Sequence, residues 1–111
     1  MSKRPVDLLL ADISEAVEKA MRYAAGMSFE IFSQDDKTVD AIVRNLEIIG
    51  EAANRLPHEF RERHSEIQWH KIIGLRNRVI HEYFGVDLEI IWHILGAELP
   101  RLHTSLQRML R

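Results

Sequence analysis

The sequence predicts an all-α fold, an antiparallel bundle of four long helices joined by short connecting helices. Three observations support this class. Apolar residues recur at helical spacing over most of the 111 residues, alternation with a period of two is absent, and five glycines and three prolines are the only strong helix breakers. Neither an internal repeat nor a low-complexity segment divides the chain, so we expect residues 1–111 to form a single helical-bundle domain.

The first long helix is indicated by its two ends and by one apolar stripe. Pro5 suits the first turn of a helix, and Gly26 is well placed to end it. Between them the apolar residues recur every three or four positions. The stripe consists of Val6, Leu9, Leu10, Ile13, Val17, Ala20 and Ala24. Residues 28–32 then read as a short helical connector.

The second long helix is apolar on two sides. Asp35 or Asp36 can cap its start, and it should end near Leu56. Its main stripe runs from Val39 to Ala53, and a second row is added by Ala41, Ile48 and Ala52. A helix of this kind is either central in a bundle or shared with a partner.

The third and fourth long helices follow a polar stretch at 57–64. Ser65 to Gln68 match a capping box, which predicts the start of the third helix. Asp87 can cap the fourth, whose leucine-rich stripe continues past Pro100. Because proline lacks an amide hydrogen, we expect Pro100 to kink this helix.

The third helix interrupts its own apolar pattern with a charge. Arg76 falls near the middle of an apolar arc that also contains Tyr83. A buried, unpaired guanidinium would cost several kcal/mol, so Arg76 must meet a negative group. That group is either an internal carboxylate, with Glu47 or Glu51 as candidates, or an anionic ligand.

A polar row lies beside this arc and consists of His70, Gly74, Asn77 and His81. Imidazole can move a proton near neutral pH and arginine can hold a phosphate, so the row suits phosphodiester chemistry; a solvent-facing helix edge is the alternative. On an ideal helix Arg76 and His81 point about 140° apart. Either the helix loosens near His81, or two copies of the chain combine across a two-fold axis.

Composition excludes several other classes. The chain has no cysteine, so disulfides, thiolate zinc sites and cysteine nucleophiles are ruled out. The six histidines show no metal-binding spacing, and we expect neither a metal nor another cofactor. No signal peptide or membrane-spanning run is evident, which predicts a cytoplasmic protein.

Charge is unevenly distributed along the chain. The net charge of −2 argues against a protein that holds nucleic acid by overall positive charge. Residues 1–60, however, carry 7 basic and 11 acidic side chains, whereas residues 61–111 carry 8 basic and 6 acidic ones with five of the six histidines. A local nucleic-acid site therefore belongs in the second half.

The segment 74–87, Gly-Leu-Arg-Asn-Arg-Val-Ile-His-Glu-Tyr-Phe-Gly-Val-Asp, resembles the signature of the HepT-like branch of the HEPN superfamily. That signature is Arg, four residues, His, one residue and Tyr, and it is met by Arg76, His81 and Tyr83. The resemblance extends to Gly26–Phe29, Arg44–Ala53, Trp69 and Leu99–Pro100. Gln68 departs from it, because proline is expected before the tryptophan.

The resemblance implies the toxin of a type VII-like toxin–antitoxin system: a homodimeric, metal-independent endoribonuclease. Arg76 would bind and polarise the scissile phosphate, and Asn77 would add a polar contact. His81 would transfer a proton as the RNA 2′-OH attacks, leaving a 2′,3′-cyclic phosphate. The partner implied is a minimal nucleotidyltransferase antitoxin that silences the toxin by transferring AMP from ATP to Tyr83.

Two other interpretations stay open at this stage. The chain could be a non-catalytic subunit that binds nucleotide or substrate for a nucleotidyltransferase complex. Alternatively, the polar residues of the third helix could be purely structural, in which case Arg76→Met would be neutral or stabilising for folding.

Overall fold

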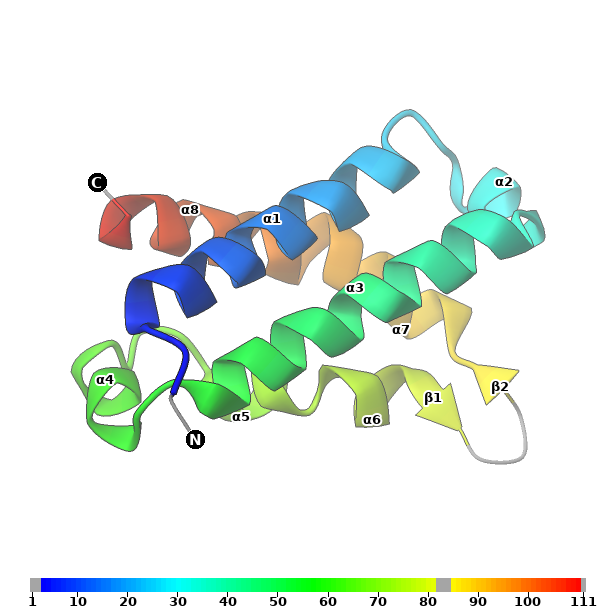
Figure 1. Cartoon of the computed structure of the whole chain (residues 1–111). Helices are drawn as coiled ribbons and strands as arrows, with labels where there is room; N and C mark the ends of the chain where they lie inside the picture. Colours follow the sequence, from blue (N-terminus) through cyan, green and yellow to red (C-terminus); the bar gives the residue numbers. More distant parts are fainter. Residues whose placement is uncertain (1–2, 82–84, 111) are drawn as a thin grey trace.

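The computed structural model describes residues 3–81 and 85–110, and the fold is all-α as predicted. Two long helices, α1 (Val6–Ala24) and α3 (Asp36–Arg55), lie side by side in Figure 1, with α7 (Leu88–His93) and α8 (Leu99–Met109) behind them. The shorter elements are α2 (Phe29–Gln34), α4 (His58–Arg63), α5 (Trp69–Ile73), α6 (Leu75–Val79), β1 (Ile80–His81), β2 (Gly85–Val86) and the π-helical turn η1 (Ile94–Glu98). Within the described residues, no helix is both long enough and apolar enough to span a membrane.

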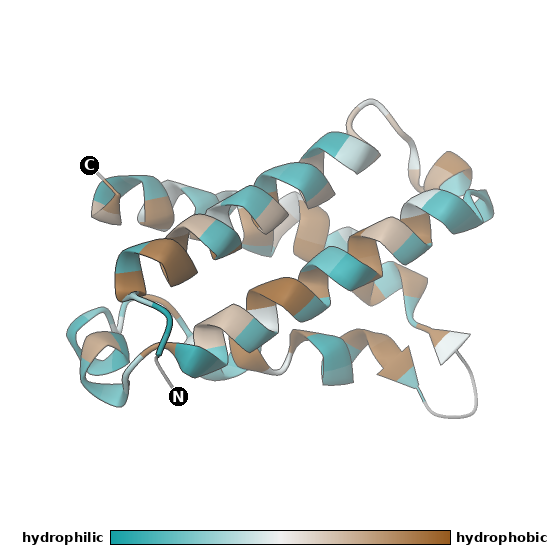
Figure 2. Cartoon of the chain, in the orientation of Figure 1, coloured by the Kyte–Doolittle hydropathy of each residue, from teal (hydrophilic) through white to brown (hydrophobic). Residues whose placement is uncertain are grey.

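The hydrophobic core is built from the predicted apolar stripes. Figure 2 shows apolar and polar residues alternating along α1 and α3, as expected for helices with one buried face. Fully buried side chains come from all the long helices and from α2, α6, α7 and η1, and burying each leucine or isoleucine contributes about 1.5–3 kcal/mol. They include Leu9, Ile13, Phe32, Ile42, Leu46, Ile49, Leu56, Leu75, Ile91, Ile94, Leu99 and Leu106.

The predicted ends of the first helices are confirmed. Pro5 precedes α1, and Gly26 adopts a left-handed backbone with φ of 80° just after it. The expected connector at 28–32 is the helix α2, and its cap, which was not predicted, is the Ser28 hydroxyl, which accepts a hydrogen bond from the Ile31 amide. Asp35 rather than Asp36 caps α3.

The third predicted helix is not one long helix, and the predicted capping box is wrong. Trp69 begins α5 without any side-chain cap. The chain before it forms turns instead, in which the His64 carbonyl accepts from the Ile67 amide and from the Trp69 indole, the latter at 3.0 Å. These turns bury Ile67 and Trp69, so hydrophobic burial decides where the helix starts.

The same segment breaks again at Gly74 and ends at Val79. At the break, the Ile73 carbonyl oxygen lies 3.0 Å from where a Cβ on Gly50 would stand, so α3 approaches the backbone of the α5–α6 junction very closely. After Val79 the chain becomes extended, and β1 pairs antiparallel with β2. Gly85, with φ of 79°, supplies the left-handed residue at the start of β2.

The fourth predicted helix is present but irregular. Asp87 caps α7, because its carboxylate accepts a hydrogen bond from the Ile90 amide at 3.0 Å. The wide turn η1 then interrupts the helix immediately before Pro100. In place of a simple kink at this proline, the helix contains a π-helical turn just before it.

Candidate active site

Three of the four predicted site residues lie on two short elements that follow α3 and precede α7 in the chain. Arg76 and Asn77 belong to α6, and His81 belongs to β1. Because the helix ends at Val79, the ideal-helix separation of about 140° no longer applies to Arg76 and His81. The helix therefore does loosen before His81, but the two side chains still line separate, adjoining grooves.

Arg76 pairs with Glu47, but at the surface. Its Nε lies 3.5 Å from Oε1 of Glu47, and 59% of the Arg76 side chain is exposed. The predicted partner is confirmed and the predicted burial is wrong, because Leu75 and Val79 take the positions that face the core. Exposed ion pairs contribute about 0–1 kcal/mol, so this guanidinium can exchange Glu47 for another anion at little cost.

Arg76 and His81 line adjoining grooves rather than one. Arg76 lines a groove of about 150 Å³ with Glu47 and Glu51. His81 lines a groove of about 530 Å³ on the side of α7. Asn77, an exposed side chain, lines both grooves and connects them. No hydrogen bond or ion pair joins Arg76 to His81 in the part of the chain that the structure describes.

One member of the predicted polar row has other surroundings, and the predicted modification site is not described. His70 is separated from Asn77 by the break at Gly74, and it lines a different groove beside His58 and Arg61. Tyr83, the predicted modification site, lies outside the described residues. Residues 3–81 and 85–110 contain no cluster of three or more histidine and carboxylate side chains arranged to hold a metal ion.

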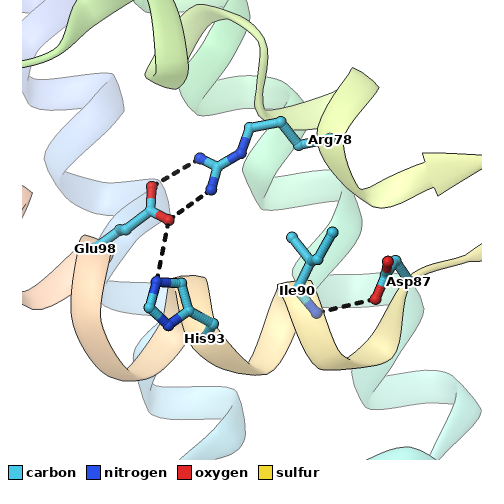
Figure 3. Close-up of polar contacts among 5 residues, drawn as sticks. All are labelled: Arg78, Asp87, Ile90, His93 and Glu98. Atoms are coloured by element: carbon cyan, nitrogen blue, oxygen red, sulfur yellow. Dashed lines mark hydrogen bonds and ion pairs between the residues drawn. The ribbon is translucent and has the colours of Figure 1, made fainter.

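A partly buried ion pair connects α6 to the π-helical turn η1. The Arg78 guanidinium donates two hydrogen bonds to the Glu98 carboxylate, at 2.7 and 2.6 Å, and His93 Nε2 lies 3.7 Å from the same group (Figure 3). Hydrogen bonding from Arg78 lowers the pKa of Glu98, and Glu98 in turn raises the pKa of Arg78. Sequence analysis missed this pair, because the two residues are 20 positions apart and Glu98 lies in a π-helical turn that was not predicted.

His81 also has an acidic neighbour that sequence analysis missed. Its Nε2 lies 3.4 Å from Oδ2 of Asp87, which was predicted only as a helix cap. Hydrogen bonding from the Ile90 amide, supported by His81, lowers the pKa of Asp87. The contact between His81 and Asp87 follows from the short β1–β2 ribbon, which the helical periodicity of the sequence did not predict.

The arrangement provides a displaceable guanidinium, an amide and an imidazole along one surface. A guanidinium binds phosphate oxygens, and an imidazole transfers protons at neutral pH. Together with the fold, this surface defines a HEPN-like helical protein with a candidate phosphodiester site.

Comparison with known proteins places the chain within that class. It belongs to the ribonuclease HepT-like family, whose model matches residues 13–109. A protein of Caldanaerobacter subterraneus subsp. tengcongensis named "Putative RNase TTE0752" is 44% identical over 102 residues, covering 92% of this chain and 91% of that protein. One of Thermococcus cleftensis named "Probable ribonuclease HepT" is 38% identical over 100 residues, covering 90% and 91% respectively. No solved structure gives a significant match.

Proposed function

We propose that this chain is an endoribonuclease that acts as a homodimer without a metal ion, and that it is the toxin of a toxin–antitoxin pair. The observation that carries the proposal is the exposed Arg76, whose weak pairing with Glu47 leaves it available to a phosphate beside the groove of His81. Membership of the ribonuclease HepT-like family and the names of its relatives support RNA as the substrate.

The proposed reaction uses only groups of the chain and of the RNA. The 2′-oxygen attacks the phosphorus, the bond from phosphorus to the 5′-oxygen breaks, and a 2′,3′-cyclic phosphate is left. One proton leaves the 2′-hydroxyl and one reaches the departing 5′-oxygen. Arg76 stabilises the charge that develops on the phosphate, His81 transfers a proton, and Asn77 contacts the phosphate between the two grooves.

Dimerisation is proposed because a single chain distributes these groups over adjoining grooves. Arg76 and His81 do not contact each other in the described chain. A two-fold axis beside Asn77 would place both sets along one cleft, where they could act on one phosphate. It would also double the local positive charge contributed by Arg76. A chain whose net charge is −2 needs such a local concentration of positive charge in order to bind RNA.

Silencing is proposed to occur by transfer of AMP from ATP to Tyr83, catalysed by a minimal nucleotidyltransferase. The modification would add a negative phosphodiester and a nucleoside two residues from His81. The new charge would repel RNA phosphates, and the base would occupy the cleft. Intact mass after co-expression with such a partner should rise by one or more adenylyl groups, and Tyr83→Phe should not show the increase.

Cleavage of a mixed RNA substrate by the purified protein in EDTA tests the central proposal. We expect cleavage by the wild type and its loss in Arg76→Ala and in His81→Ala, with both variants folded by circular dichroism. Arg108→Ala and His58→Ala are matched controls, because both residues are exposed and far along the chain from this site, and they should keep full activity.

Comparing RNA cleavage by the wild type and the site variants distinguishes the two candidate functions. Cleavage that persists in both site variants contradicts the site assignment. Absence of cleavage in the wild type, combined with nucleotide binding that requires Arg76, favours the alternative of a non-catalytic subunit in a nucleotidyltransferase complex.

A further inference from the structure

The β1–β2 ribbon places His81 and Asp87 on the same face. His81 lies directly opposite Gly85, and the Asp87 amide donates to the Val79 carbonyl at 2.7 Å, which continues the pairing. Residues two positions apart on a strand share a face, so Asp87 is the diagonal neighbour of His81. Because Gly85 has no side chain, the imidazole can lean across it toward Asp87.

Helix α7 fixes the carboxylate that His81 meets. One oxygen of Asp87 accepts the Ile90 amide at 3.0 Å, and the other lies 3.4 Å from Nε2 of His81. Figure 3 shows the first of these bonds at the start of α7. The same amide, with a smaller contribution from His81, lowers the pKa of Asp87, so its carboxylate stays charged at neutral pH. Its side chain is 30% exposed and that of His81 is 48% exposed, so both groups face the groove.

The other charged groups of this groove are placed differently. Arg78 and His93 are both directed to Glu98. Glu89 lines the groove, but within the described residues its carboxylate makes no ion pair with His81. Asp87 is therefore the acidic group that holds His81 in the described part of the chain.

We infer that Asp87 is a positioning residue for His81, an inference that rests on the ribonuclease function proposed above. Asp87 binds Nε2–H, which fixes the ring and leaves Nδ1 as the nitrogen that exchanges a proton with the RNA. If the ring were turned by about 180° around its bond to Cβ, the carbon Cε1 would face the carboxylate instead of Nε2, and the hydrogen bond would be lost. In the reaction, Nδ1 takes the proton of the 2′-hydroxyl as the new oxygen–phosphorus bond forms, or gives one to the 5′-oxygen as its bond to phosphorus breaks.

Substitutions that keep the helix cap separate positioning from capping. Serine and asparagine cap helices about as well as aspartate, but serine is too short to reach His81 and asparagine lacks the charge. For RNA cleavage we expect kcat to fall at least about 10-fold in Asp87→Ser and less in Asp87→Asn, with KM and thermal midpoint unchanged. Asp35→Ser is the matched control, because Asp35 caps α3 in the same way away from the site, and it should keep full kcat. Equal kcat in the wild type and Asp87→Ser would overturn the inference.

Chemical replacement of His81 tests which nitrogen reacts. Nδ1-methylhistidine at position 81 blocks proton transfer at Nδ1 and leaves Nε2 with the only free lone pair of the ring, so Nε2 can donate to Asp87 only when the ring is protonated. We expect this protein to lose cleavage and to keep RNA binding. Cleavage at the wild-type rate would show that Nε2 reacts and would refute the assignment.

A readout without RNA separates failure of this inference from failure of the proposed function. Long-range ¹H–¹⁵N spectra of neutral His81 should show a proton on Nε2 alone in the wild type, and both ring nitrogen shifts should move in Asp87→Ser. Unmoved shifts would contradict the pairing whatever the protein's activity. A wild type that shows the pairing but cleaves no RNA would refute the ribonuclease proposal, and the positioning role with it.

Discussion

The ion pair between Arg78 and Glu98 should stabilise the fold measurably, unlike most surface pairs. Its two hydrogen bonds are 2.7 and 2.6 Å long, and the side chains are only 28% and 20% exposed. Hydrogen bonds to charged groups contribute about 1.5–3 kcal/mol each, and partial exposure reduces that contribution. Glu98→Gln keeps one acceptor but loses the charge, so we expect the free energy of unfolding to fall by about 2 kcal/mol.

Urea unfolding followed by circular dichroism at fixed protein concentration measures this change. A loss of about 2 kcal/mol corresponds to a fall of roughly 8 °C in the melting temperature of a domain of this size. Asp12→Asn is the matched control. Asp12 also receives two hydrogen bonds from an arginine, Arg4, but that pair is more exposed, at 43% and 34%, and its loss should change stability little.

The pH dependence of the same variant gives an independent check. Arg78 lowers the pKa of Glu98 below its ordinary value of 4.5, so the folded state binds the Glu98 proton less tightly than the unfolded state. The stabilisation is therefore complete above pH 4.5 and is lost as the pH falls toward the lowered pKa. Glu98→Gln should lack this component of acid destabilisation. A variant as stable as the wild type at neutral pH, with the same acid profile, would refute the reasoning.

Two glycines and the salt dependence of binding give further predictions. Gly85→Ala should destabilise the fold by about 1–2 kcal/mol, because the backbone at Gly85 has a φ of 79°. Gly96→Ala should stabilise the fold by about 0.5–1 kcal/mol, because position 96 lies in a helical turn and a Cβ added there would meet nothing within 4 Å. Thermal melts measure both, and equal shifts would contradict the backbone argument. RNA affinity of His81→Ala should fall steeply with salt, and adding Arg76→Ala should reduce the slope of log K against log salt by about 1 per protomer. An unchanged slope would mean that Arg76 contacts no phosphate.

The all-α class, the ends of the first two long helices and the start of α7 were predictable because each depends on local chemistry. The stripes, Gly26 and the caps at Ser28, Asp35 and Asp87 all act within a few residues of their position. The length of the third helix depends instead on tertiary contact. Its break occurs where α3 approaches, and helical periodicity cannot report an approach by another element.

The candidate site was predictable to the same extent. The sequence indicated Arg76, Asn77 and His81 as candidates, whose roles stay predictions, and it proposed Glu47 as one of two partners for Arg76. It placed that pair in the core, because an ideal helix was assumed around Arg76. The contact of His81 with Asp87 arises from a strand pairing of two residues, which is too short to leave a pattern in the sequence.

The close approach at Gly50 makes the position of Arg76 depend on a residue that has no side chain. Every one of the other nineteen amino acids adds at least a Cβ, and that atom would stand 3.0 Å from the Ile73 carbonyl oxygen and 3.2 Å from that of Ile72. Backbone cannot yield there as a flexible side chain would, so α3 would have to separate from α5, whose end leads directly into the helix that carries Arg76. In a saturation library, position 50 should therefore reject substitutions of every chemical type, because any added Cβ disturbs the backbone contact between α3 and the α5–α6 junction.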